Sequence, residues 1–118
     1  MHLKECVLKK LFLFVLFFSV EASADSFCTG KIKTLAISKS GVLLVGGPGG
    51  LPSTYLCNTE TKINNVEPSA CKATYGMLLA AKAQAKDVSI TFNPGISSCS
   101  SVASWGWATN FNWVMFKE

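Results

Sequence analysis

The longest apolar run of the chain lies near its start, between a basic segment and a short run of small residues. Leu11 to Phe18 is apolar without interruption, and Ala22-Ser23-Ala24 follows a few residues later. Three lysines precede the run: Lys4, Lys9 and Lys10. This order is typical of a secretory signal peptide, and the run is too short to cross a bilayer, which needs about 20 apolar residues. We therefore predict a signal peptide at residues 1–24, cleaved after Ala24; an uncleaved membrane anchor is the alternative.

Beyond residue 24, short apolar runs predict three β-strands in the first half of the chain. Lys31 to Ile37 alternates imperfectly between apolar and polar residues, and Val42 to Val45 is continuously apolar. The turn at 38–41 joins these two strands into a hairpin, and Ser53 to Asn58 is the third strand. The segment 46–52 is rich in glycine and proline. It lacks the lysine and the following helix of a phosphate-binding loop, so we expect a mobile hairpin connection there.

One segment repeats its apolar residues with the period of a helix, Glu67 to Lys86. Pro68 suits the first helical turn, where its missing N–H group costs nothing. The residues expected to face the core recur at steps of three and four: Ala70, Thr74, Met77, Leu78, Ala81 and Ala85. Gly76 costs roughly 1 kcal/mol relative to alanine inside a helix, and a close approach of the helix to the sheet would explain its presence.

The last third of the chain predicts two more strands, separated by a loop rich in serine and tryptophan. Asp87 to Asn93 alternates strictly between apolar and polar residues, which is the clearest strand pattern of the chain. The loop contains Ser97 to Ser104 and then Trp105-Gly106-Trp107. Asn110 to Phe116 is the final strand. Its two faces are both apolar, so we expect it to be buried on both sides or to lie in a subunit interface.

The predicted element order is therefore β-β-β-α-β-β. A five-stranded, partly open barrel with a helix after the third strand is the OB-fold, so the predicted fold class is mostly β with one helix in an OB-like barrel. An α+β sheet with the helix on one face is the alternative. Removing the signal peptide from the 118 residues leaves 94, which suffices for a single small domain at 25–118 and not for two.

The four cysteines that remain after the signal peptide predict two disulfides, as expected for a short exported chain. Three pairings are possible. We favour Cys57–Cys71, which closes a short loop ahead of the helix, and Cys28–Cys99, which ties the start of the domain to a late loop. A structural metal is disfavoured, because the chain has no Cys-x-x-Cys pair and its only histidine is His2. We expect the protein in the periplasm or outside the cell.

The composition of the predicted mature chain argues against several functions. Its net charge falls from +4 to +3, because three lysines and two acids lie in the signal peptide. The remaining lysines are scattered, so we expect no nucleic-acid partner. The mature chain has no histidine and no arginine, so no imidazole can serve as the base of a Ser-His-Asp or Cys-His site. We therefore predict that the protein is not an enzyme and needs no cofactor.

The element order resembles that of the pentamer-forming B subunits of bacterial AB toxins, which are small exported OB-fold proteins with disulfides that bind host glycans. Three features are also similar to those of uncharacterised small secreted proteins of Gram-negative bacteria. They are a G-x-I-x-x-L start at Gly30 to Leu35, the pair Cys57-Asn58, and a C-K-x-x-Y-x-x-L-L-x-A-K-A helix at Cys71 to Ala83. The resemblance implies a fold and a route of export, and very little about activity.

The aromatic residues of the late loop are the best candidates for a binding site. Aromatic side chains on a loop can stack on sugar rings or become buried in a protein interface. We predict a secreted binding module that recognises a glycan or an extracellular protein through Trp105, Trp107 and nearby hairpin ends. Gly106 allows the backbone shape that points the two tryptophans outward. The alternative is that Trp113 belongs to the core and that one of the other two covers the barrel end.

Two other functions are compatible with the same residues. The first is a structural or accessory subunit that assembles with copies of itself through the aromatic strand at 110–116. The second is an inhibitor of an extracellular hydrolase, because small disulfide-linked domains with protruding loops suit that function.

Overall fold

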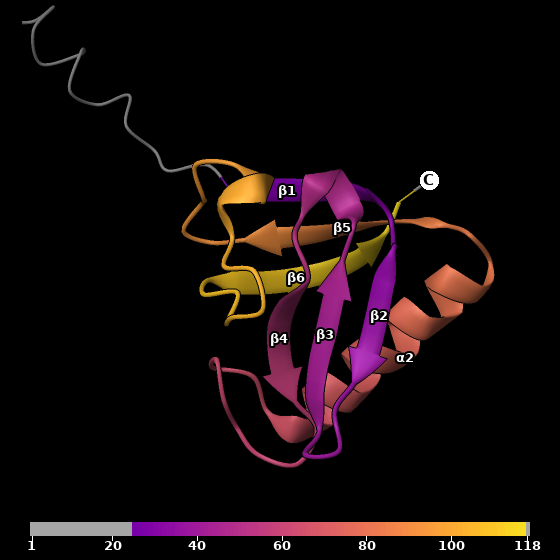
Figure 1. Ribbon diagram of the computed structural model, residues 1–118, viewed down its shortest axis with the longest axis vertical. Helices are drawn as coiled ribbons and strands as arrows, with labels where there is room; N and C mark the ends of the chain where they lie inside the picture. Colours follow the sequence, from indigo (N-terminus) through magenta and orange to yellow (C-terminus); the bar gives the residue numbers. More distant parts are fainter. Residues whose placement is uncertain (1–24, 118) are drawn as a thin grey trace, which may run out of the picture.

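The computed structural model describes residues 25–117, so the predicted signal peptide lies outside the described part of the chain. Within that range the fold is mostly β, with one long helix, α2 (Pro68–Ala83). Two short 3-10 segments, η1 (Pro48–Gly50) and η2 (Cys99–Ser101), lie in the connections. Figure 1 shows the strands grouped into two sheets whose directions cross, with α2 to one side of them.

One sheet combines strands from both ends of the described chain. β5 (Asp87–Phe92) lies between β1 (Ser26–Lys31) and β6 (Phe111–Phe116), and both pairings are antiparallel. The sequence pattern predicts β5 and β6 with nearly these bounds. It does not predict β1, because only Cys28 of that strand is buried and the strand is held by pairing with distant β5.

The other sheet contains the predicted hairpin and the predicted third strand. β3 (Val42–Gly46) lies between β2 (Thr34–Ile37) and β4 (Thr54–Asn58), again antiparallel. The predicted strand at 31–37 is divided, because Lys31 ends β1 and the backbone then passes from one sheet to the other before β2 begins. The strands therefore form two three-stranded antiparallel sheets rather than one closed five-stranded barrel, and they do not form a single sheet with the helix on one face.

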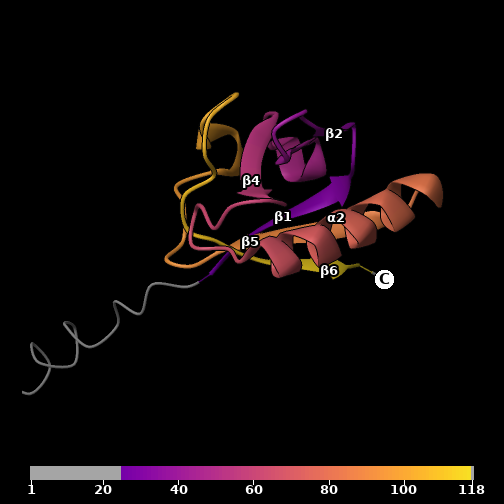
Figure 2. The ribbon, with the colours of Figure 1, turned by 90° about the horizontal axis from the view of Figure 1, so that it is seen from below.

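The core lies between the two sheets and α2. Its largest fully buried side chains come from β3, β4, α2 and β5: Leu43, Leu56, Leu78, Ile90 and Phe92. α2 contacts β4, β5 and β6, and Figure 2 shows the helix lying alongside β5 and β6. Each layer thus contributes to one continuous core.

The buried face of α2 is turned relative to the predicted stripe. Cys71, Leu78 and Ala81 are buried, whereas Ala70 and Met77 are exposed. The predicted residues have helical spacing, but more than one stripe of this helix is apolar. The disulfide at Cys71 fixes which of these stripes faces β4.

The helix ends at Ala83, three residues before the predicted end at Lys86. Ala85 has a left-handed backbone with φ 51°. Its N–H donates to Lys82 O (3.1 Å), and the N–H of Lys86 donates to Ala81 O (2.9 Å). These two bonds form a Schellman motif, which closes a helix by satisfying its last carbonyl groups.

Two predictions about glycines differ from the structure. A Cβ on Gly76 would have no heavy atom within 4 Å, so a close approach to the sheet does not explain this residue. In contrast, a Cβ on Gly49 would lie 2.9 Å from Thr29 N of β1. The segment 46–52, predicted as a mobile hairpin connection, instead packs closely against β1 and buries Leu51.

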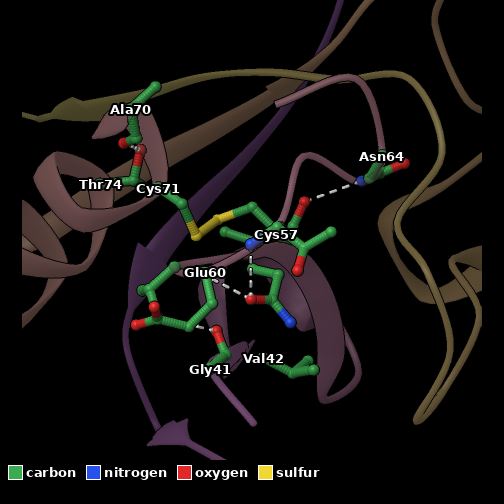
Figure 3. Close-up of a disulfide and its surroundings, with 12 residues drawn as sticks. Gly41, Val42, Cys57, Glu60, Asn64, Ala70, Cys71 and Thr74 are labelled. Atoms are coloured by element: carbon green, nitrogen blue, oxygen red, sulfur yellow. Dashed lines mark hydrogen bonds between the residues drawn. A yellow bond between two sulfur atoms is a disulfide. The ribbon is translucent and has the colours of Figure 1, made fainter. Parts of the chain in front are cut away.

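Both predicted disulfides are confirmed. Cys28–Cys99 joins β1 to η2, and Cys57–Cys71 joins β4 to the start of α2. Figure 3 shows the second disulfide with nearby Asn64, whose side-chain amide donates to a backbone carbonyl of β4 (2.9 Å). Disulfides persist in oxidising compartments, so both bonds are consistent with an exported protein. No helix within residues 25–117 is long and apolar enough to span a membrane.

Candidate ligand-binding groove

Three residues from neighbouring strands form an apolar row on the outer face of the β2–β3–β4 sheet. Ala36 is opposite Leu44 in the register, and Leu44 is opposite Tyr55. Directly opposite residues share one face of a sheet, and successive residues of a strand alternate between faces. Leu43 and Leu56, the chain neighbours of Leu44 and Tyr55, are fully buried in the core. The row Ala36–Leu44–Tyr55 therefore lies on the side of the sheet away from the core.

The loop that follows η2 is fixed along the free edge of β4. The N–H of Trp105 donates to the carbonyl of the residue before β4 (2.7 Å). The N–H of Tyr55 donates to Gly106 O (2.8 Å), and the N–H of Ala108 donates to Tyr55 O (2.9 Å). The last two bonds make a parallel bridge between Tyr55 and Trp107. The tryptophan loop is therefore attached to the sheet by its own backbone.

The two predicted site tryptophans have different environments. The Trp105 side chain is 65% exposed, and the Trp107 side chain is half-buried. Both rings meet Tyr55 edge to face, with ring centroids 6.4 Å from it for Trp105 and 5.4 Å for Trp107. The outward direction does not arise at Gly106 as predicted. Trp105 itself has the left-handed backbone, with φ 53°, and Gly106 does not.

A cavity of about 400 Å³ lies between the β2–β3 hairpin and the side chains of Tyr55 and Trp105. We call it the aromatic groove. Its other lining residues are Ala36, Ile37, Ser38, Ser40, Val42 and Leu44, and none of them carries a charge. The volume is in the range of small-molecule sites, about 300–1,000 Å³, which are mostly apolar and contain a few placed polar groups.

The polar groups of the aromatic groove come from the hairpin turn. The hydroxyls of Ser38 and Ser40 lie 3.0 Å apart, and the N–H of Val42 donates to Ser38 Oγ (2.9 Å). A serine hydroxyl has one donor and two acceptor positions, so each retains capacity for a ligand. The groove therefore offers an aromatic wall, an aliphatic floor and two hydroxyls.

Trp113 lies on the other sheet, and its side chain is 62% exposed, so the alternative that it belongs to the core is wrong. The strand containing it is also not buried on both sides, because Met115 and Phe116 are exposed as well. β6 is an edge strand, and its register with β5 shifts between Ile90 and Phe92. The register shift and the absence of a strand on the outer side of β6 within the described sheet together leave Trp113 at the surface.

The sequence prediction of the site included Trp105, Trp107 and nearby hairpin ends, but it named neither Tyr55 nor any residue of the β2–β3 hairpin. One signal could have identified Tyr55. It lies in the predicted third strand beside apolar Leu56, so if Leu56 faces the core, strand alternation puts the tyrosine on the outer face. No local signal shows that the tryptophan loop lies beside this strand.

No carboxylate of residues 25–117 lines the aromatic groove, and two of them lie in exposed ion pairs. Glu67 pairs with Lys62 (3.1 Å) at the start of α2, and Asp87 pairs with Lys31 (2.5 Å) at the start of β5. Exposed pairs of this kind contribute about 0–1 kcal/mol to stability. Within residues 25–117, no group of three or more His, Cys, Asp or Glu side chains could hold a metal ion.

Comparisons with known proteins give no family assignment. No protein-family model, no curated protein and no solved structure matches the chain. The chemistry of the aromatic groove is therefore the basis for assigning a function.

Proposed function

We propose that the protein is an exported, non-catalytic binding module that holds a neutral glycan in the aromatic groove. One observation carries the proposal. The exposed indole of Trp105 stands at 87° to Tyr55 beside an uncharged cavity of about 400 Å³. Tryptophan offers a broad apolar face together with an N–H donor. A sugar ring has the matching combination of an apolar C–H face and hydroxyl groups.

The chemistry of the groove favours a neutral ligand. A buried ligand carboxylate would need a cationic partner to offset its desolvation. Lys39 lies in the same hairpin turn, but its side chain is not part of the groove lining. The hydroxyls of Ser38 and Ser40 can instead exchange hydrogen bonds with the hydroxyls of an uncharged sugar.

The attachment of the tryptophan loop favours a glycan over a hydrolase target. An inhibitor needs a loop that reaches into the cleft of its enzyme. Here the backbone of Trp105 and Gly106 is hydrogen-bonded along β4, and the exposed side chain borders a concavity. A concave surface suits a small ligand better than a protruding or flat protein surface.

An array that contains both neutral and sialylated glycans tests the proposal. The wild-type protein should bind neutral glycans, and Trp105→Ala should weaken that binding by about tenfold or more, equivalent to about 1.4 kcal/mol. Trp113→Ala is the matched control, because it removes an equally exposed indole from the other sheet. An array without bound protein, or equal binding by wild type and Trp105→Ala, would contradict the proposal.

We propose in addition that the two sheets are the halves of a partly open OB-like barrel. One contact supports this. The Tyr55–Trp107 bridge attaches the segment that leads into β6 of one sheet to β4 of the other. The observed order, β-β-β-β-α-β-β, keeps the helix and the two final strands of the order on which the resemblance to the B subunits of bacterial AB toxins rests, with one more strand before the helix.

A second candidate function, self-assembly through β6, is favoured by a separate observation. Trp113, Met115 and Phe116 are 62%, 36% and 46% exposed on one edge strand. An edge strand with exposed apolar side chains can pair with another chain. Sedimentation over a range of concentrations should show oligomers of the wild type and monomers of Trp113→Lys. A wild-type protein that stays monomeric at every concentration would exclude this candidate without affecting the aromatic groove.

A further inference from the structure

A second cavity, of about 440 Å³, is lined mainly by asparagine residues. The loop between β4 and α2, the residue after β5 and the segment leading into β6 all contribute to it. Five of its lining residues are asparagines: Asn64, Asn65, Asn93, Asn110 and Asn112. Thr109 and Phe111 complete the lining, and none of the seven residues is charged. We call this cavity the asparagine pocket.

Among residues 25–117, one of the five amides has a side-chain hydrogen-bond partner. The Nδ2 group of Asn64 donates to Leu56 O and to Ala108 O, both at 2.9 Å, and so links the β4–α2 loop to the tryptophan segment. The other four asparagine side chains are exposed and make no side-chain hydrogen bond within residues 25–117. Their donors and acceptors remain free for a ligand.

Backbone requirements account for some of these asparagines but not for all. Asn64, Asn65 and Asn110 have φ values of 56°, 60° and 69°, a left-handed region that asparagine tolerates better than most residues. Asn93 and Asn112 do not have positive φ. Asn112 also lies within a strand, where asparagine is disfavoured. The turns alone therefore do not explain why these amides meet in one cavity.

We propose that the asparagine pocket is a second binding site, for an uncharged polyhydroxylated ligand such as one saccharide unit. Each carboxamide has two N–H donors and one carbonyl acceptor, so it complements a hydroxyl group in either direction. An anionic ligand would find no cationic side chain in the lining, and a Ca²⁺ ion would find no carboxylate. The half-buried Phe111 adds an apolar surface for the ring.

The asparagine pocket is independent of the aromatic groove, because the two cavities share no lining residue. A single segment nevertheless connects them. Trp105 lines the groove, and residues 109–112 line the pocket. Because no residue belongs to both linings, each site can be tested while the other is disabled.

Titration of the ¹⁵N-labelled exported protein, with both disulfides formed, tests the proposal through the side-chain amide signals. The probes are galactose, N-acetylglucosamine and L-fucose at millimolar concentrations. At least one sugar should move the four free amide signals together and to saturation, those of Asn65, Asn93, Asn110 and Asn112. The Gln84 side-chain signal is the internal control and should not move, because Gln84 lines neither cavity and its Nε2 group donates to Ala80 O within α2 (3.2 Å).

Substitutions assign the effect to the pocket. Asn112→Ala and, from a different element, Asn93→Ala should each raise the sugar concentration at half-saturation about tenfold. Gln84→Ala, which removes an exposed amide at the end of α2, should leave it unchanged. Trp105→Ala should also leave it unchanged, which separates this site from the aromatic groove. The proposal is overturned if no probe moves the four amide signals, or if Trp105→Ala abolishes their movement.

Discussion

Trp105 combines an exposed indole with a backbone conformation that residues other than glycine rarely adopt. Its φ of 53° costs on the order of 1–3 kcal/mol and persists only where neighbouring structure determines it. Two hydrogen bonds to β4 and the residue before it hold this backbone conformation. The N–H of Trp105 donates to Ser53 O, and the N–H of Tyr55 donates to Gly106 O. The direction of the indole is therefore set before any ligand arrives, and this preorganisation reduces the entropy cost of binding.

A second left-handed residue gives a prediction about stability at the scale of one residue. Ala85 occupies the C′ position of the Schellman motif, where glycine is preferred because it lacks the Cβ clash. Ala85→Gly should raise the free energy of unfolding by about 1 kcal/mol in urea denaturation. Ala83→Gly, inside the last helical turn, should lower it by about 1 kcal/mol. A loss of stability in Ala85→Gly would contradict the assignment of this cap.

Some residue-level features could be predicted from the sequence and others could not. The disulfides could, because four cysteines allow few pairings and short exported domains need such crosslinks. The exposure of Trp113 and the inclusion of Tyr55 in the groove could not. Each depends on which strand edge is free and on which loop lies beside it, and these are properties of distant pairing.

At the scale of elements, α2 is held by one narrow face. Leu78 is fully buried at the centre of that face, so Leu78→Ala should lower the free energy of unfolding by about 2–5 kcal/mol. Lys82→Ala is the control on the exposed side and should change it by less than about 0.5 kcal/mol. Chemical denaturation of the two variants measures the difference. Equal effects would mean that α2 docks by another face.

The exposed face of the same helix carries a substitution that should stabilise the protein. Gly76 is exposed, and a Cβ there would meet no heavy atom within 4 Å. Gly76→Ala should therefore raise the free energy of unfolding by about 1 kcal/mol, because alanine has the higher helix propensity. Thermal denaturation followed at the helix signal measures the effect. A decrease would show that this position needs glycine for a contact that the fold does not reveal.

Elements with strong local periodicity were predictable, and elements defined by distant pairing were not. The alternation of β5 is an example of both. It predicts the strand, but it does not show that the polar residues of the alternation, Ser89 and Thr91, are buried as well. The Ser89 hydroxyl lies 2.8 Å from the hydroxyl of Thr29 in β1. β1 was not expected beside β5, so its covering effect could not be foreseen.

At the scale of the whole molecule, the two disulfides constrain loops of very different length. Cys28 and Cys99 are separated by 71 residues, and Cys57 and Cys71 by 14. In the chain-entropy account, loops of these lengths correspond to about 4 and about 3 kcal/mol of stabilisation. Replacing both cysteines of the longer bridge by alanine should therefore destabilise the protein more than replacing both of the shorter one. Calorimetry of the two double variants compares them, and the reverse order would show that native-state contacts outweigh loop closure.

The account of function depends on a ligand lying against Trp105, and the fluorescence of that residue tests it most directly. The chain has three tryptophans, so the double variant Trp107→Phe, Trp113→Phe leaves Trp105 as the only indole. The titrant is the neutral glycan that binds best to the wild type on the array. We predict a saturable change in Trp105 emission, with a midpoint that matches the binding curve of the same variant. Unchanged emission at glycan concentrations that saturate binding would contradict the placement of the ligand in the aromatic groove.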